Sequence, residues 1–249
     1  AEMSATHGVL LEDLTWVEAE RALTPQTLIL LPLGAAAKEH GPHLKLKNDL
    51  ILAEYFKKRI QERTEVVIAP TVTYHFYPAF LEYPGSTSLR LETARDLVVD
   101  ICRSLARHGP RRFYVLNTGI STVRALAPAA EQLAKEGILL RYTDLHQALI
   151  PIEKEIAQQP GGSHADEIET SMILAIDPVS VDMNKAARDF EPNRPGPLTR
   201  RRDNGGAYSP SGVWGDATLA SPEKGEKILK AVMAVLLRDL DELRAAQLP

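Results

Sequence analysis

Apolar runs alternate with amphipathic stretches along most of this chain. A short continuous apolar run predicts a buried strand, and apolar residues spaced three or four apart predict a helix. Buried strands are predicted at 27–35, 65–74, 111–119 and 138–145. Helices are predicted at 48–63, 91–109, 121–137, 146–158, 164–176 and 222–247. Because strands that alternate with helices of this length form parallel sheets covered on both faces, we expect a three-layer α/β/α sandwich with a mainly parallel sheet.

The segment 186–221 interrupts this alternation. It is rich in Pro, Gly and Arg, which predicts a long irregular loop, and loops of this length in compact domains are usually functional or disordered. The rest of the pattern shows no internal repeat. For 249 residues we therefore expect a single domain over 1–249, with 186–221 as a loop excursion.

Composition narrows the classes of function. The net charge is −4 and charges of both signs are mixed along the chain, so no basic stripe indicates nucleic-acid binding. No apolar run approaches the roughly 20 residues of a membrane span. The single cysteine, Cys102, is expected to be a buried thiol. The first residues leave the compartment open between an exported (periplasmic) mature chain and a cytoplasmic protein.

The first loop that carries chemistry follows the strand predicted at 27–35. It contains His40 and Asp49, nine residues apart, around a Gly-Pro turn. Ligands bind beyond the carboxyl ends of parallel strands, and imidazole with carboxylate is a usual pair for Zn²⁺ or Mn²⁺. These residues also fit a polar loop histidine and a helix N-cap, so the stretch alone leaves both interpretations open.

A second such loop lies at 161–171. His164, Asp166, Glu167 and Glu169 fall within six residues there. Acidic residues favour the first turn of a helix, and Asp166 with Glu169 fits an Asp-type capping box. His164, which precedes this helix start, is also well placed as a general acid/base or a ligand. The residues by themselves leave this choice open too.

Five stretches in a fixed order resemble the creatininase (creatinine amidohydrolase) family. They span about residues 8–246 and include PLGAAAKEHGPHLKLKND (32–49), EYPGSTSLR (82–90), NTGIST (117–122), HADEIETS (164–171) and SGVWGDATLASPEKGE (211–226). The resemblance implies an α/β/α fold and a divalent metal site, often dinuclear, that holds Zn²⁺, Mn²⁺ or Fe²⁺. It also implies hydrolysis of a C–N bond in a small cyclic amide, amide or related substrate by metal-bound hydroxide, and a homo-oligomer, often a hexamer.

The resemblance carries over to individual residues only in part. His40 matches the first-motif histidine, Asp49 the bridging aspartate, Glu169 a metal-binding glutamate and His164 the catalytic-loop histidine. We therefore expect a divergent subgroup with an altered metal site. The alternative to an active enzyme is a catalytically impaired relative that binds a ligand or serves as a structural partner.

Two positions depart from the family pattern. Lys38 stands where the family has a glutamate, so Glu39 is the expected replacement ligand through a one-residue shift. Lys38 either places its ammonium where a metal ion has been lost, or it is a surface lysine. Gly119 stands where the family has a histidine, and His75 either replaces that imidazole or belongs to an aromatic cluster. His43 is expected to be structural.

A mechanism follows from these assignments. The metal or Lys38 would stabilise the oxyanion, and His164, assisted by Glu167, would pass a proton to the leaving nitrogen. The irregular segment contains Arg200–Arg202, Tyr208 and Trp214. These residues are candidates for the mouth of the site or for a contact between subunits. The alternative for the three arginines is a solvated loop.

Overall fold

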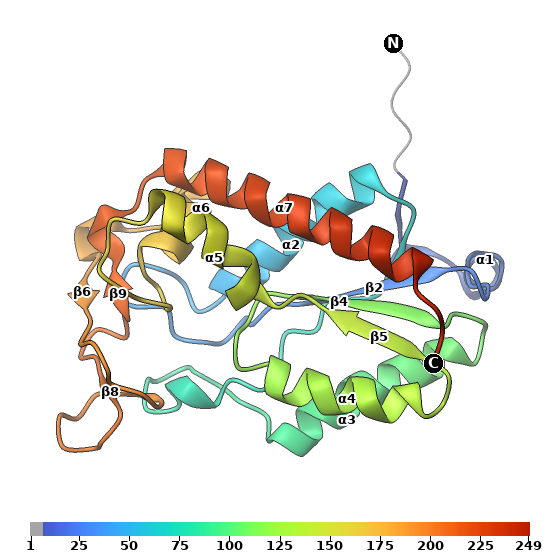
Figure 1. Ribbon diagram of the computed structural model, residues 1–249, viewed down its shortest axis with the longest axis horizontal. Helices are drawn as coiled ribbons and strands as arrows, with labels where there is room; N and C mark the ends of the chain where they lie inside the picture. The colour runs from blue at the N-terminus through green and yellow to red at the C-terminus, as the bar shows by residue number, and fades with distance from the viewer. Residues whose placement is uncertain (1–6) are drawn as a thin grey trace, which may run out of the picture.

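The central element is a five-stranded parallel sheet with the strand order β1-β3-β2-β4-β5 (Figure 1). It is seen in a computed structural model that describes residues 7–249. The first residues of the chain, on which the two expectations about the cellular compartment rest, lie outside this range. The strands are β1 (Val9–Leu10), β2 (Leu28–Leu33), β3 (Val67–Ile68), β4 (Arg112–Asn117) and β5 (Leu139–Tyr142).

Helices cover both faces of the sheet (Figure 1). On one face lie α1 (Trp16–Ala22), α3 (Leu91–Ala106) and α4 (Val123–Ala134). On the other lie α2 (Asn48–Arg63), α5 (Leu145–Ile156), α6 (Glu167–Ile176) and α7 (Pro222–Ala245). The predicted three-layer α/β/α architecture is confirmed.

Strand β2 is apolar throughout because helices cover both of its faces. Its six residues are all buried, because successive side chains point to opposite faces and both faces are covered. Ile29 and Leu31 pack in the layer of α3 and α4, whereas Leu28 and Leu30 pack against the helices of the other face.

The strand predicted at 65–74 is shorter than expected. Only Val67–Ile68 forms a ladder, and the one later pairing is an isolated bridge between Leu33 and Val72. Pro70 lies between them and has no N–H to donate to a ladder, which is why regular pairing stops there.

The 186–221 excursion contains more structure than its composition predicted. Strand β6 (Arg188–Asp189) pairs antiparallel with β9 (Gly215–Asp216), and β7 (Leu198–Thr199) pairs parallel with β8 (Ala207–Tyr208). In Figure 1 these strands lie beyond one end of the main sheet, at the side toward which β2 and β4 run. The excursion thus closes over the carboxyl ends of the central strands.

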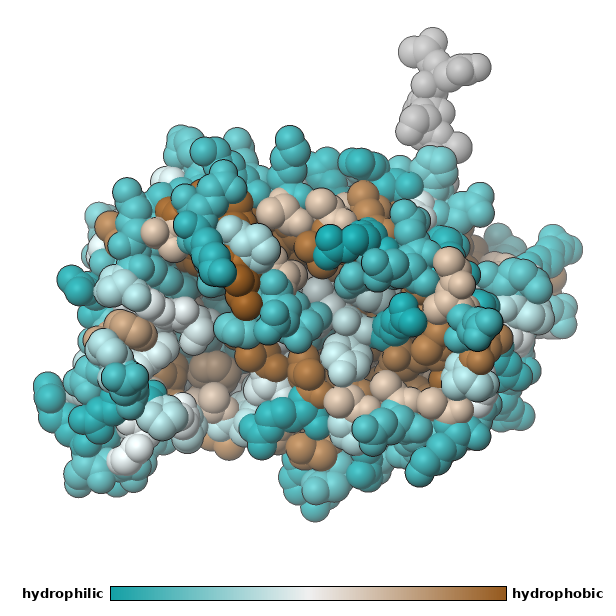
Figure 2. Space-filling model, in the orientation of Figure 1, coloured by the Kyte–Doolittle hydropathy of each residue, from teal (hydrophilic) through white to brown (hydrophobic). Residues whose placement is uncertain are grey.

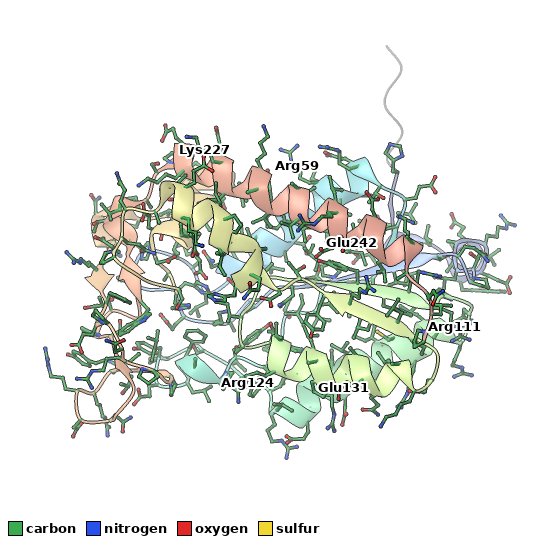
Figure 3. All side chains as sticks on the ribbon, viewed as in Figure 1. Arg59, Arg111, Arg124, Glu131, Lys227 and Glu242 are labelled. Carbon is green, nitrogen blue, oxygen red and sulfur yellow. The ribbon has the colours of Figure 1, made fainter. Side chains whose placement is uncertain are left out.

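Figure 2 shows polar residues over most of the visible face, with apolar residues in bands between the two helical layers. Figure 3 shows Lys227 directed outward from α7, whereas Glu242 of α7 and Glu131 of α4 line a hollow with residues of β5. Cys102 is buried, as expected. Among the described helices, none has both the length and the apolar character needed to cross a bilayer.

Candidate metal centre

Close packing between β2 and α2 places the first loop. Gly34 follows β2, and a Cβ added to it would lie 2.4 Å from the backbone oxygen of Asp49. Only glycine therefore permits the first turn of α2 to approach the end of the strand so closely. The loop 34–47 must fold back over this junction, which brings its polar side chains above the carboxyl end of the sheet.

Three predicted metal ligands meet around one imidazole. Nε2 of His40 lies 3.1 Å from Oδ1 of Asp49 and 3.2 Å from Oε2 of Glu169. These residues come from the β2–α2 loop, the first turn of α2 and the first turn of α6. His40 and Asp49 are buried, and the Glu169 side chain is only 16% exposed.

The protonation of His40 follows from its contacts. Its Nδ1 lies 3.0 Å from the carbonyl oxygen of Lys38, and because a carbonyl only accepts, Nδ1–H is the donor. That leaves Nε2 facing two carboxylates. Burial disfavours the charged ring, but the nearby Asp49 and Glu169 outweigh it and raise the pKa of His40 to about 10.

Lys38 is a buried residue of the centre, so the surface alternative is wrong. Its residue exposure is 5%, and its Nζ lies 2.6 Å from Oδ2 of Asp49. Burial alone would raise the pKa of the Asp49 carboxyl. The positive charge of Lys38, together with His40, holds that pKa well below its usual range.

Glu39 contacts His164 rather than His40. Its Oε1 lies 2.7 Å from Nε2 of His164, whose ring also lies 2.8 Å from the backbone oxygen of Glu39. Both partners of Nε2 are oxygen acceptors, so Nε2–H donates and, in the neutral ring, Nδ1 carries the lone pair. Gly41 N donates to the other carboxylate oxygen of Glu39 at 2.9 Å. Glu39 therefore orients His164, which differs from its expected role as a ligand.

The residues fit a divalent cation. His40, His164 and Glu169 offer ligand atoms that all lie within 4.8 Å of one another, and Oδ1 of Asp49 lies 3.1 Å from the same Nε2 of His40 that faces Glu169. Nε2 of His40 is buried between two carboxylates and makes no well-aligned hydrogen bond, whereas its Nδ1–H is fixed by a carbonyl. A metal-binding histidine shows this arrangement, because the hydrogen bond at one ring nitrogen aims the other at the ion, whose binding would displace the proton from that nitrogen.

Glu167 lies outside the centre. Its buried carboxylate accepts from the backbone N–H groups of Gln158 and Gln159 and pairs with Lys224 Nζ at 2.7 Å. These contacts do not include His164, which Glu167 was predicted to assist. The helix predicted from 164 begins at Glu167 because Asp166 caps it, accepting from the backbone N–H of Glu169 at 3.0 Å. The Glu169 carboxylate turns to His40, so the capping box is only half formed.

Two further candidate histidines, His75 and His43, are not among the residues grouped with His40. His75 is completely buried, both ring nitrogens lack partners, and its ring lies 6.5 Å from that of Tyr77, so it belongs to the aromatic surroundings. It does not replace the imidazole missing at Gly119. His43 is structural, as expected: its Nε2 lies 2.8 Å from the hydroxyl of Thr170 on α6.

A cavity of about 340 Å³ opens beside the centre. Lys38, His164 and Glu169 line its inner side, Thr118 to Ser121 another, and Phe80, Arg194 and Trp214 the rest. Phe80 and Arg194 were missed in the sequence; Phe80 stacks on His164 with ring centroids 4.2 Å apart. Arg200–Arg202 do not line this cavity, and Arg202 lies over the ring of Tyr208 instead.

Comparison with known sequences gives hydrolases over nearly the whole chain. The family profile Creatininase, described as creatinine amidohydrolase, matches residues 12–240. The creatinine amidohydrolase of Pseudomonas putida is 30% identical over 90% of this chain and 92% of its own length. A mycofactocin precursor peptide peptidase of Mycobacterium ulcerans is 30% identical over 80% and 79%. A 3-dehydro-scyllo-inosose hydrolase of Thermotoga maritima is 27% identical over 99% and 88%.

Solved structures agree in fold. A crystal structure of creatinine amidohydrolase superposes with a TM-score of 0.81 at 25% identity, over 98% of this chain and all of the other. A variant creatininase described as Zn-Zn type superposes with a TM-score of 0.77 at 26% identity, over 94% and 97%. A further structure, described as creatininase Mn, superposes with the same TM-score. On the match of both sequence and fold, this chain belongs to the creatininase family of amidohydrolases.

Proposed function

We propose that this protein hydrolyses a C–N bond in a small cyclic amide, amide or related substrate, with a divalent ion held by His40, Asp49 and Glu169. The observation that carries the proposal is the buried Nε2 of His40, which faces two carboxylates and makes no well-aligned hydrogen bond, while Nδ1 is held by a backbone carbonyl. The nitrogen and oxygen donors suit Zn²⁺ or Mn²⁺, with Fe²⁺ as a further candidate.

The chain's own residues supply the remaining chemistry. A bound divalent ion would lower the pKa of water from about 15.7 towards 7 and so provide a nucleophile at neutral pH. Lys38 lines the cavity and offers an ammonium to the developing oxyanion of the substrate carbonyl. His164 also lines the cavity, and Nδ1, the ring nitrogen not bound to Glu39, can carry a proton to the leaving nitrogen.

The cavity favours a small substrate that is partly apolar. Phe80, Ile120 and Trp214 form apolar wall, and Ser121 and Ser163 add hydroxyl groups. These groups can hold a compact ring or a short side chain while its carbonyl approaches Lys38. Water would be restricted there once a substrate fills the space.

A second candidate function is binding without hydrolysis. The loop after β4 presents Gly119 and no imidazole to the cavity, and Lys38 is already paired with Asp49. These two facts favour an impaired relative. The retained buried group of His40, Asp49 and Glu169 favours the enzyme, because such groups cost free energy when they are buried without a partner.

A metal-depletion experiment tests the proposal. Protein treated with a chelator would be assayed with a panel of cyclic amides, linear amides and short peptides, before and after addition of Zn²⁺ or Mn²⁺. We expect turnover of at least one class that appears only with metal and is lost in His40→Ala. The matched control is His108→Ala, since His108 is exposed after α3. Metal-independent turnover, or metal binding that survives in His40→Ala, would contradict this assignment.

We further propose that the chain forms a homo-oligomer, a hexamer by family resemblance. Trp16 is 77% exposed and Val179 is 94% exposed, and contacts between copies would cover such side chains. Light scattering after size-exclusion chromatography gives the mass directly. A monomer at micromolar concentration would contradict this proposal.

A further inference from the structure

The two oxygens of the Asp49 carboxylate face different nitrogen-bearing side chains. Oδ1 lies 3.1 Å from Nε2 of His40, on the side of Glu169, and Oδ2 lies 2.6 Å from Nζ of Lys38. Each oxygen therefore faces a different nitrogen. A carboxylate that bridges two metal ions commonly gives one oxygen to each, and here the second oxygen is paired with an ammonium.

The Lys38 ammonium is fixed in this position by aromatic rings. Its Nζ lies 5.3 Å from the ring centroid of Tyr77 and 5.1 Å from that of Phe80. Aromatic faces attract cations, and the attraction is greater where water is excluded, as it is around this buried side chain. The ammonium is thus held by one carboxylate and two rings.

Among the described residues that line the cavity beside Lys38, only His164 and Glu169 carry an imidazole or a carboxylate. The loop after β4 contributes Thr118, Gly119, Ile120 and Ser121 to the cavity wall, none of which has an imidazole or a carboxylate. In the described part of the chain, the histidine and glutamate donors that come together are His40, His164 and Glu169. A tightly held transition-metal ion needs about three protein ligands, and the Lys38 side of Asp49 supplies one oxygen.

The balance of charges in the site also disfavours a second divalent ion. Asp49, Glu169, Glu39 and the Lys38 ammonium together carry a formal charge of minus two when the three carboxylates are ionised. One divalent ion brings this to zero, and a second would leave two uncompensated positive charges in a buried site. Burying uncompensated charge is costly in free energy, so the second ion is strongly disfavoured.

We propose that Lys38 takes the place of a second cation beside Asp49, so that the centre binds one divalent ion and not two. This inference rests on the proposed function, because it requires that the first ion binds. It separates the chain from its relative in the Zn-Zn form. The ammonium then provides, without a second metal, the positive charge on that side of the substrate.

Metal stoichiometry tests this directly. Chelator-treated full-length protein would be titrated with Mn²⁺ or Zn²⁺ by calorimetry, and the metal retained after desalting would be counted by plasma mass spectrometry. We expect one ion per chain. Two ions per chain would overturn the inference while leaving the proposed function intact. No bound ion would overturn the proposed metal dependence, and the inference with it.

Variants at Lys38 test whether this residue sets the limit. Lys38→Glu replaces the ammonium with a carboxylate, and we expect a second Mn²⁺ to bind. Lys45→Glu is the matched control, because it makes the same charge change at an exposed position of the same loop and should stay at one ion. A Lys38→Glu protein that binds one ion with unchanged affinity would contradict the role given to Lys38.

A second substitution covers the case in which Lys38→Glu does not fold. Lys38→Met removes the charge and keeps the length of the side chain between Tyr77 and Phe80. Removing a positive charge next to the ion should tighten binding of the first Mn²⁺ about tenfold, since like charges repel strongly in a buried site. Unchanged or weaker binding would contradict the inference.

Discussion

The carboxylate of Glu39 lies 2.7 Å from Nε2 of His164, although the two residues are 125 positions apart in the chain. The carboxylate fixes which ring nitrogen carries the proton, because an ionised carboxylate can only accept. In the neutral ring, Nδ1 of His164 then carries the lone pair. Glu39 thus acts on the cavity through His164.

Glu39→Gln should weaken this control. An amide can donate or accept, so the tautomer of His164 would no longer be fixed, and we expect kcat of the metal-loaded enzyme to fall by roughly 10- to 100-fold. Metal stoichiometry should not change. Nitrogen NMR of the histidine rings reports the tautomer, and Glu12→Gln at an exposed position is the control. A variant with unchanged kcat and altered metal content would instead make Glu39 a ligand.

Gly212 makes room for the Glu39 carboxylate. Its φ is +88°, and a Cβ there would lie 2.1 Å from Oε2 of Glu39. Gly212→Ala should therefore lower the free energy of unfolding by about 1–3 kcal/mol and displace Glu39 from His164. The control is Gly205→Ala, where φ is +72° but nothing lies within 4 Å of the added Cβ. Denaturant unfolding separates the two; equal losses would mean that backbone strain, and not the clash, is responsible.

Stability should fall in mild acid because of His75. Burial lowers the pKa of this partnerless ring to about 4, whereas the unfolded chain has a pKa near 6.5. Between these values the unfolded state binds more protons, so the free energy of unfolding decreases as pH falls from about 6.5 to about 4, by up to roughly 3 kcal/mol. His75→Leu should reduce this slope, measured by urea unfolding at several pH values. A slope that stays the same would show that other groups, such as His43, account for it.

Glu167 should matter for stability and not for catalysis. Its buried carboxylate joins α6 to Lys224 of α7, and the loss of one partner from a buried pair costs about 3–5 kcal/mol. Glu167→Gln keeps the shape, so we expect a loss at or below the low end of that range, with kcat per folded molecule unchanged. Glu223→Gln, exposed on the neighbouring turn, is the control. A fall in kcat at unchanged stability would restore the catalytic role predicted from the sequence.

The sequence alone was enough to predict the layers of the fold. Continuous apolar runs such as Leu28–Leu33 can be satisfied only where both faces of a strand are covered, and the helical period between them shows which segments cover it. These signals are local, since they depend on the spacing of neighbouring side chains. The end of the ladder at Ile68 could also be foreseen from Pro70, although the predicted strand ran past it.

The candidate ligands could be named from the sequence, but their partners could not. His40, Asp49 and Glu169 stood out by residue type and spacing, whereas Glu39 and Lys38 were open to several interpretations. The tertiary structure alone decided that Glu39 bonds to His164, that Lys38 pairs with Asp49, and that Glu167 turns away to Lys224. The physical reason is that each of these contacts joins separate segments of the chain or depends on how a tight loop folds, and a side chain's pairing inside the protein is fixed by the close packing of such segments rather than by its neighbours in sequence.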